Sequence, residues 1–189
     1  MSTHLIAGLG NPGPKYELNR HNVGFMALDE MARRWGASAF REKFKGEFTK
    51  VRVAGDEVVL LKPMTYMNLS GESVQAAMRF FKVPLERVLC VHDELDLEFG
   101  VARLKAGGGT AGHNGLRSMV QHCGGPDFLR CRLGIGRPPR GRPEHWVLSD
   151  FGSLEQAELP AVLELAADMA ESTVRDGVRK AMNQHNGRS

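Results

Sequence analysis

Polar side chains suited to acid–base chemistry gather near the start of the chain. A short apolar run, residues 5–9, ends in a turn that carries Asn11, and the chain returns through Arg20, His21 and Asn22 to an amphipathic segment. Ligands of open α/β sheets usually bind where a strand ends in such a turn. A neutral imidazole accepts a proton, and a carboxamide both donates and accepts hydrogen bonds. This stretch therefore predicts a polar site with a histidine as its base.

The position of His21 bears on its charge. Apolar residues recur at helical spacing over residues 22–36, and Gly36 is typical of a helix end. His21 then falls at or just before the N-terminus of this helix, where exposed amides carry partial positive charge and disfavour an imidazolium. We expect this position to help keep the imidazole neutral.

Further polar groups follow other predicted elements. Asp93 comes directly after a predicted buried strand, residues 87–91, and Asn68 lies in a turn between a strand and a helix. Asn114 stands beside His113 in a segment with five glycines, and glycine allows a ligand to approach the backbone closely. Each of these groups follows or adjoins a predicted strand end, so we expect them to share one site.

The chemistry of this set favours hydrolysis. A carboxylate that holds one nitrogen of an imidazole fixes its tautomer and raises its basicity, so that the ring can deprotonate a water molecule that attacks an acyl carbon. Carboxamides can hold this water or donate to the developing oxyanion. The residues that predict such a polar, metal-free site are His21, Asp93, Asn11, Asn68 and Asn114.

A dinucleotide-binding turn is one alternative. The run G-L-G-N-P-G fits the pattern G-x-G-x-x-G, with Asp29 or Glu30 as the acid for the ribose. In such a turn the helix begins within the glycine motif so that its N-terminus meets the pyrophosphate. Here Pro12 and Pro14 delay the helix, and the spacing does not suit that task.

A zinc site is a second alternative. Its ligands would be His21, His92, Asp93 and His113, which come from separate stretches and match no recognised metal-ligand spacing. Covalent catalysis has less support, because the sequence contains no G-x-S-x-G elbow and none of its three cysteines stands in an electropositive glycine-rich turn. The odd number of cysteines argues against a disulfide framework and indicates a reducing compartment.

Charge is distributed unevenly along the chain. The formal net charge is +3, but residues 101–145 carry eight arginines and lysines against two acidic residues, a net +6. One basic face of this kind is typical of proteins that bind a polyanion such as nucleic acid. An RNA-binding module without catalysis is therefore a third alternative. It has few aromatic side chains for base stacking, since tyrosine and tryptophan occur twice each.

Length and pattern predict one α/β domain over residues 1–189, with a mixed, mostly parallel twisted sheet flanked by helices. The basic, proline-rich stretch 137–145 predicts irregular structure, and residues 148–151 are expected to form a mobile lid beside the site. Pro160 is expected to divide the last helical region into a short turn and a long C-terminal helix. No stretch of about 18 apolar residues and no signal-peptide pattern occurs, which predicts a cytoplasmic protein.

Five motifs, taken in order, resemble the bacterial peptidyl-tRNA hydrolase family. They are G-L-G-N-P-G-x-x-Y-x-x-x-R-H-N-x-G, K-P-x-T-Y-M-N-x-S-G, H-D-E-L-D-L, G-G-G-x-x-G-H-N-G-L-R-S and R-L-G-I-G-R-P, and together they span residues 8–138. Each motif is weak alone, whereas five in the family's order are highly specific.

This resemblance implies a hydrolase that cleaves the ester between a peptide and the 3′ end of tRNA, and so recycles tRNA for translation. It implies a single α/β domain that acts as a monomer, without a metal or other cofactor. The catalytic set would be His21 as general base, Asp93 as the group that orients it, and Asn11. The other matching residues would surround the substrate: Asn68 and Asn114 position water and ester, Tyr16, Met67 and His113 line the cleft, and Lys105 and Arg132 lie near the tRNA phosphates.

Overall fold

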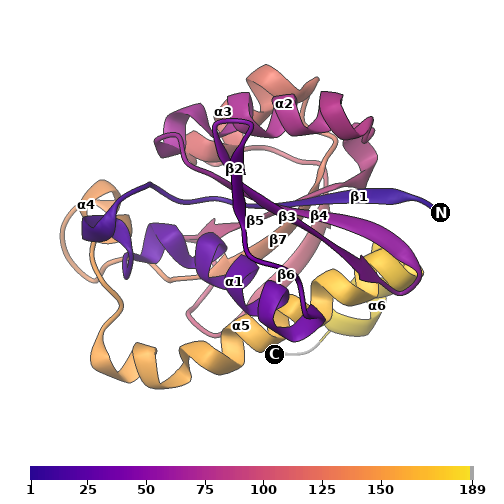
Figure 1. Cartoon of the computed structure of the whole chain (residues 1–189). Helices are drawn as coiled ribbons and strands as arrows, with labels where there is room; N and C mark the ends of the chain where they lie inside the picture. Colours follow the sequence, from indigo (N-terminus) through magenta and orange to yellow (C-terminus); the bar gives the residue numbers. More distant parts are fainter. Residues whose placement is uncertain (188–189) are drawn as a thin grey trace.

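A computed structural model describes residues 1–187, in which seven strands form one sheet between two layers of helices (Figure 1). The strand order is β2-β3-β4-β1-β5-β7-β6. The strands are β1 (Thr3–Gly8), β2 (Arg41–Lys43), β3 (Gly46–Val53), β4 (Asp56–Pro63), β5 (Val88–Glu94), β6 (Ala102–Ala106) and β7 (Leu129–Gly134). The α-helices are α1 (Val23–Trp35), α2 (Ser70–Phe81), α3 (Asn114–Cys123), α4 (Pro143–Val147), α5 (Ser153–Asp176) and α6 (Val178–His185). Short 3-10 helices are η1 (Pro14–Tyr16), η2 (Arg20–Asn22), η3 (Met67–Leu69) and η4 (Leu85–Arg87).

The four central strands, β4-β1-β5-β7, run parallel to one another. At the edges β3 is antiparallel to β4, and β6 is antiparallel to β7. This confirms the predicted mixed sheet with its parallel centre. Because the central strands share one direction, the chain leaves β1, β4 and β5 at the same edge of the sheet, and the polar groups that follow these strands meet there.

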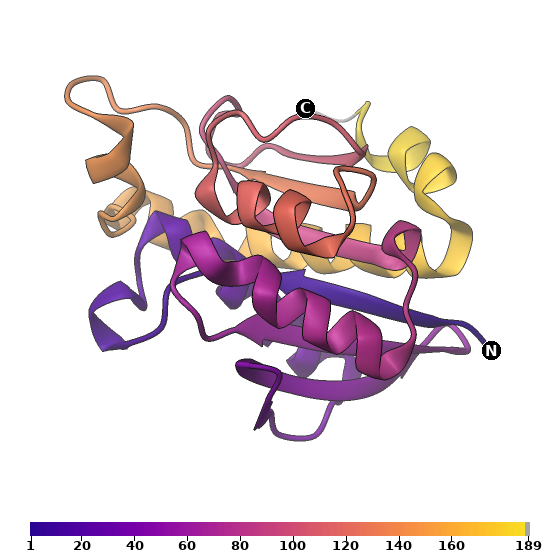
Figure 2. The ribbon, with the colours of Figure 1, turned by 90° about the horizontal axis from the view of Figure 1, so that it is seen from above.

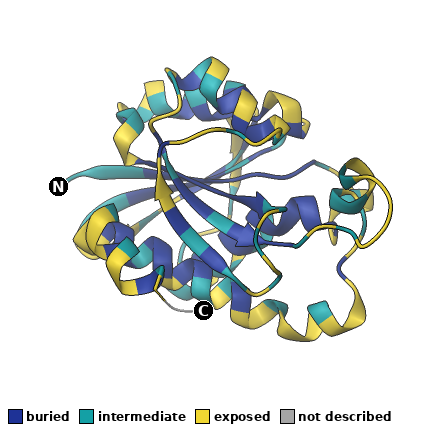
Figure 3. Ribbon diagram, turned by 180° about the vertical axis from the view of Figure 1, so that it is seen from behind, coloured by how far each residue is buried: buried dark blue, intermediate teal, exposed yellow. Residues whose placement is uncertain are grey.

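Helices cover both faces of the sheet. Helices α2 and α3 lie on one face, and α1, α5 and α6 lie on the other (Figure 2). Along β1, Leu5 and Ala7 pack into the core under α2 and α3, whereas Ile6 packs into the core under α1 and α5. The centre of the sheet is buried on both sides (Figure 3). A strand buried on both faces needs a continuous apolar sequence, which explains the apolar run of residues 5–9.

Helix α1 lies so close to β1 that their backbones touch. A Cβ atom on Gly8 would lie 2.3 Å from the carbonyl oxygen of Gly24, and a Cβ atom on Gly24 would lie 2.5 Å from the carbonyl oxygen of Val91. Only glycine fits at either position, because no real Cβ approaches another atom so closely. Since α1 begins two residues after His21, this close contact also fixes the position of His21 relative to the sheet.

Strand β5 is longer than the sequence pattern indicates. Asp93 does not follow the strand but lies within it, because it pairs with Leu133 of β7 while His92 pairs with Arg132. Because the last three residues of β5 are polar, the apolar pattern that predicts a strand does not extend to them. The Asp93 side chain is nevertheless presented at the carboxyl edge of the sheet, as predicted.

Two predictions based on proline were wrong. The end of the basic stretch 137–145 enters helix α4, whose first residue is Pro143, a position where the fixed φ suits the helix and the missing N–H is not needed. Pro160 does not divide the C-terminal region, because α5 runs through it for 24 residues. Its side chain is exposed, so water can bind the carbonyl that loses its helical donor. The predicted long C-terminal helix is therefore confirmed in α5.

Candidate active site

A cleft of about 490 Å³ opens at the carboxyl edge of the central strands. Its walls come from β5, η3, the start of α3 and the α4 region, which are far apart in the sequence. Seven of the ten predicted site residues line it: Asn11, His21, Met67, Asn68, Asp93, His113 and Asn114. The structure therefore brings these seven side chains to one cleft.

His21 and Asp93 are directly paired in this cleft. His21 Nδ1 lies 2.7 Å from Asp93 Oδ2, and both side chains are buried. An ionised carboxylate only accepts hydrogen bonds, so Nδ1 carries the proton and donates it. The other ring nitrogen, Nε2, is then left with its lone pair.

His113 holds the second oxygen of the same carboxylate. Its Nδ1 accepts hydrogen bonds from the backbone N–H groups of Gly115 (3.1 Å) and Leu116 (3.2 Å), so the imidazole caps the N-terminus of α3. The proton of the neutral ring must therefore be on Nε2, which donates to Asp93 Oδ1 over 2.8 Å. His113 is thus fixed as a donor to Asp93, and protonating its Nδ1 would break the cap of α3.

The pKa of His21 departs from the expected direction. Burial alone lowers it, but the charge of Asp93 and its hydrogen bond together outweigh burial, so the pKa is raised above its ordinary value of 6.5. The helix N-terminus, which was expected to help keep this ring neutral, therefore does not set the direction of the pKa shift. A carboxylate at hydrogen-bond distance acts more strongly on the imidazole than the partial charges of the helix amides.

The neighbouring groups have the opposite shift. Burial alone raises the pKa of Asp93, but the charges and hydrogen bonds of His21 and His113 lower it well below its usual range, so it remains a carboxylate. Burial and the nearby His113 lower the pKa of His92 to about 3. His92 is therefore neutral, and its Nδ1 donates to the backbone carbonyl of Asp93 over 2.8 Å.

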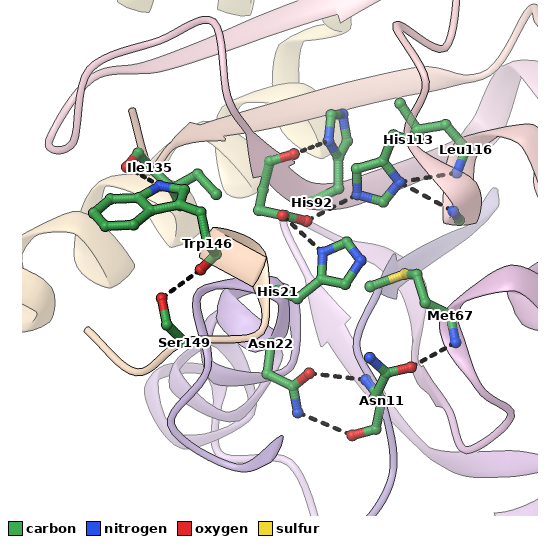
Figure 4. Close-up of polar contacts among 12 residues, drawn as sticks. Asn11, His21, Asn22, Met67, His92, His113, Leu116, Ile135, Trp146 and Ser149 are labelled. Atoms are coloured by element: carbon green, nitrogen blue, oxygen red, sulfur yellow. Dashed lines mark hydrogen bonds and ion pairs between the residues drawn. The ribbon is translucent and has the colours of Figure 1, made fainter. Parts of the chain in front are cut away.

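Asn11 is held rigidly on the opposite side of His21 (Figure 4). Its backbone N–H donates to Asn22 Oδ1 (2.8 Å), its carbonyl accepts from Asn22 Nδ2 (2.9 Å), and its Oδ1 accepts from the backbone N–H of Met67 (2.7 Å). Because Oδ1 is used in this way, the amide nitrogen Nδ2 is the group on the side of His21. Asn11 can therefore donate a hydrogen bond into the cleft.

Asn114 reaches the cleft by a route that the sequence did not reveal. Strand β6 is antiparallel to β7, so its last residue, Ala106, pairs with Leu129 at the opposite edge of the sheet from the cleft. The glycine-rich segment 107–113 carries the chain back to the N-terminus of α3, where Asn114 is exposed. Asn68 is exposed in η3 on the other side of the cleft.

Buried Arg130 holds the glycine-rich segment in place. Its guanidinium donates to the carbonyl oxygens of Gly108 and Gly109 and to that of Pro126. It also lies 4.4 Å from the ring centroid of Phe128. The route of the segment that ends at His113 is therefore fixed by a side chain from β7.

Three predicted residues lie outside the cleft lining. Tyr16 packs edge-on against Tyr66, which does line the cleft, with ring centroids 6.5 Å apart. Arg132 Nε donates to Glu94 Oε1 over 3.0 Å, and Glu94 also lines the cleft. Lys105 is exposed on β6. Tyr16 and Arg132 therefore contact residues of the cleft lining, whereas Lys105 lies next to Ala106, at the opposite edge of the sheet from the cleft.

The cluster of His21, Asp93 and His113 does not suit a resident metal ion. Its potential ligand atoms lie within 4.8 Å of one another. The same atoms are joined by hydrogen bonds in which the two imidazoles donate to the carboxylate. A metal would need the lone pair of His113 Nε2, which requires a proton on Nδ1 and the loss of two hydrogen bonds at the start of α3. The arrangement of His21, Asp93 and His113 therefore suits proton transfer better than metal binding.

The cysteines are not suited to nucleophilic catalysis. All three are free and buried, and burial raises the pKa of Cys123 and of Cys131 to about 12 and that of Cys90 further. None of them lines the cleft formed by the described residues. Thiolates would be scarce at neutral pH.

Several residues that shape the cleft were not assigned to the site from the sequence. Asn22 forms hydrogen bonds with the backbone of Asn11, and Arg20 is buried beside Trp146. The only sequence signal for Asn22 and Arg20 was the triplet R-H-N. Leu148, expected in a mobile lid, lines the cleft, and the two residues after it are bound to the segment before His21. The mobility of that segment stays a prediction.

Comparison with known proteins agrees with this geometry. A family model described as "Peptidyl-tRNA hydrolase" matches residues 5–189. The chain is 52% identical over 187 residues to a peptidyl-tRNA hydrolase of Sorangium cellulosum, which covers 97% of this chain and 84% of that protein. It is 48% identical over 188 residues to that of Geobacter metallireducens, with 100% and 97% covered. The crystal structure of peptidyl-tRNA hydrolase from Acinetobacter baumannii matches with a TM-score of 0.91 and 43% identity, covering 97% of this chain and 94% of that one.

Proposed function

This chain belongs to the peptidyl-tRNA hydrolase family and hydrolyses the ester bond of peptidyl-tRNA, and we propose that His21 is the general base of this reaction. The observation that carries the proposal is the ordered series His113, Asp93, His21. Two donors keep Asp93 ionised, and Asp93 keeps the His21 proton on Nδ1. The lone pair of Nε2 is then available to a water molecule.

In the proposed first step, His21 Nε2 takes a proton from water while the water oxygen attacks the acyl carbon of the ester. The carbonyl bond opens to an oxyanion, which accepts a hydrogen bond from Asn11 Nδ2. Asn68 and Asn114, exposed on two sides of the cleft, hold the water and the ester in line. Amide donors directed at the developing charge lower the barrier without reorganising.

In the proposed second step, the tetrahedral intermediate collapses and the bond to the ribose oxygen breaks. The imidazolium of His21 gives its Nε2 proton to that oxygen, so the products are a tRNA with a free 3′ hydroxyl and a peptide with a free carboxyl group, which then releases its proton to the solvent. Asp93 stabilises the imidazolium between the two steps. The negative charge of Asp93 and its hydrogen bond to His21 are also the reason that the pKa of His21 lies above 6.5.

A hydrolysis assay with metal-depleted protein tests the proposed metal-free mechanism. We expect the purified protein, dialysed against EDTA, to release N-acetylated aminoacyl groups from tRNA at an undiminished rate, because no step uses a metal ion. The release is measured by loss of acid-precipitable label. A control adds Zn²⁺ back to the dialysed protein. Loss of activity in EDTA with recovery in Zn²⁺ would favour the zinc alternative, and tRNA binding without release would favour a non-catalytic RNA-binding module.

Lys105 and Arg132 are proposed to bind tRNA phosphates. Each phosphate contact releases condensed counterions, so the logarithm of the affinity falls linearly with the logarithm of salt concentration. We expect Lys105→Ala and Arg132→Ala each to make this slope shallower by roughly one contact. Titrations of tRNA at several salt concentrations measure it, with Lys50→Ala on β3 as the control. Unchanged slopes in both variants would remove these residues from the tRNA site.

Further properties are also proposed. No helix in the described part of the chain is both long and apolar enough to cross a lipid bilayer. We place the enzyme in the cytoplasm as a monomer of one domain, residues 1–189, because its substrate arises during translation and its three cysteines are free thiols. Tyr16 and Met67 would line the path of the acceptor end and the peptide.

A further inference from the structure

Arg20, the residue immediately before His21, is buried, and both of its terminal nitrogens have partners, whereas its buried Nε has no hydrogen-bond partner. Its Nη1 donates to Ser149 Oγ (2.6 Å) and to the carbonyl oxygen of Asp150 (2.8 Å), and its Nη2 forms an ion pair with Glu155 Oε1 (2.6 Å). The guanidinium carbon lies 3.5 Å from the ring centroid of Trp146. Each of these partners belongs to α4, to the start of α5 or to the connection between them.

The backbone repeats this connection. The N–H of Arg20 donates to the carbonyl of Ser149 (3.0 Å), and the N–H of Phe151 donates to the carbonyl of Leu18 (3.2 Å). Asn19 forms an isolated antiparallel bridge with Asp150, and its Nδ2 donates to Asp150 Oδ1 (2.8 Å). The segment that carries His21 is therefore joined to the α4–α5 connection by both side chain and main chain.

The segment held in this way is a wall of the cleft. Pro143, Glu144, Val147 and Leu148 line the same cleft as His21. Trp146, on which Arg20 stacks, also donates from Nε1 to the carbonyl of Gly136 (2.9 Å), so it anchors α4 to the segment that follows β7. Arg20 therefore joins the segment that carries His21 to the facing wall of the cleft, and it can hold the two at a fixed distance from each other.

We propose that Arg20 is a positioning residue that sets the width of the cleft between His21 and the α4 wall, and so governs how tightly the substrate is seated there. This rests on the proposed function of the same site. Arginine suits the task because its planar group donates in several directions while it stacks on an indole, whereas lysine offers a single point charge. Arg20 does not touch the reacting atoms and acts through the wall.

The test compares Arg20→Lys with Arg34→Lys. Arg34 also joins the α1 region to α5, through Asp168 Oδ1 and the carbonyl of Glu164, but it does not contact α4 or the connection between α4 and α5. We expect Arg20→Lys to raise KM about tenfold with kcat changed less than about threefold, because a less firmly held wall weakens the binding of substrate and transition state alike. Arg34→Lys should leave both constants unchanged. Equal effects in the two variants, an unchanged KM, or a fall in kcat alone would overturn the proposal.

A second measurement does not depend on activity. In a Trp35→Phe background the remaining tryptophan is Trp146, and we expect Arg20→Lys to increase its quenching by acrylamide, because the stacked guanidinium no longer shields the indole. Unchanged quenching contradicts the proposal even if the wild type proves inactive on peptidyl-tRNA, so failure of the proposed function is recognised separately. If Arg20→Lys does not fold, Ser149→Ala removes one hydroxyl partner of Arg20 and is expected to raise KM in the same direction.

Discussion

The His21→Ala variant is expected to lose about 10²–10⁴-fold in kcat for peptidyl-tRNA hydrolysis while KM changes little, because a positioned general base contributes an effect of this size. The alanine side chain cannot accept the proton of the attacking water, whereas the residues that hold the substrate are unchanged. Single-turnover release of labelled N-acetylaminoacyl groups measures kcat directly. Substrate binding, followed by fluorescence of a labelled tRNA, should be close to that of the wild type.

His4→Ala provides the matched control. His4 Nε2 lies 3.1 Å from Asp56 Oδ2, so it is a second histidine–aspartate pair, located at the start of β1 and away from the cleft. We expect normal turnover from this variant. A His21→Ala protein that unfolds cooperatively at a similar denaturant concentration yet turns over normally would remove His21 as the base.

The Asp93→Asn variant is expected to lose about as much activity, about 10²–10⁴-fold, for a different reason. Asp93 accepts hydrogen bonds from both His21 and His113. An asparagine offers one accepting oxygen and one donating nitrogen, so one imidazole must change its tautomer. If His21 changes, its Nε2 carries a proton and cannot act as a base; if His113 changes, its Nδ1 no longer caps α3.

The same variant should alter the pH dependence of kcat/KM. In the proposed mechanism the base is the neutral form of His21, so we expect wild-type activity to rise with pH through a pKa above 6.5 and then to level off. Burial alone lowers the pKa of His21, and Asp93→Asn removes the charge that opposes burial. The inflection should therefore move to lower pH while the plateau falls. Stopped assays from pH 5 to 9 measure both, with Asp56→Asn as the control. An inflection at the wild-type pH in Asp93→Asn would contradict the assigned role of Asp93.

The sequence predicted the position of a side chain correctly where that position depends on the local pattern of apolar residues. Asn11, His21 and Asp93 meet because parallel strands end at one edge, and the apolar runs of β1 and β5 identify such strands. Asn114 was assigned to the same site for a weaker reason. Its segment follows a strand in the sequence, but β6 is antiparallel and ends at the far edge, a fact set by its pairing with β7.

Other features depend on contacts between distant segments. The raised pKa of His21 follows from a carboxylate that lies 72 residues away in the chain and outweighs the nearby helix terminus. Arg20 and Trp146 have ordinary sequence surroundings, and only the folded chain stacks one on the other. Pro160 is tolerated in α5 because its face of the helix is exposed, and exposure is a property of packing. Local periodicity contains none of this information.

The backbone contact between β1 and α1 makes two glycines as intolerant of replacement as the groups that perform the chemistry. Any side chain on Gly8 would meet the carbonyl of Gly24, and any on Gly24 would meet that of Val91. A survey of all single substitutions scored by activity would therefore rank these glycines beside His21. A survey scored by the amount of folded protein would distinguish the glycines from His21. We expect the fold to be retained when His21 is replaced and to be disrupted when Gly24 is replaced. The part of the chain that does not tolerate replacement is thus expected to be larger than the surface that meets the substrate.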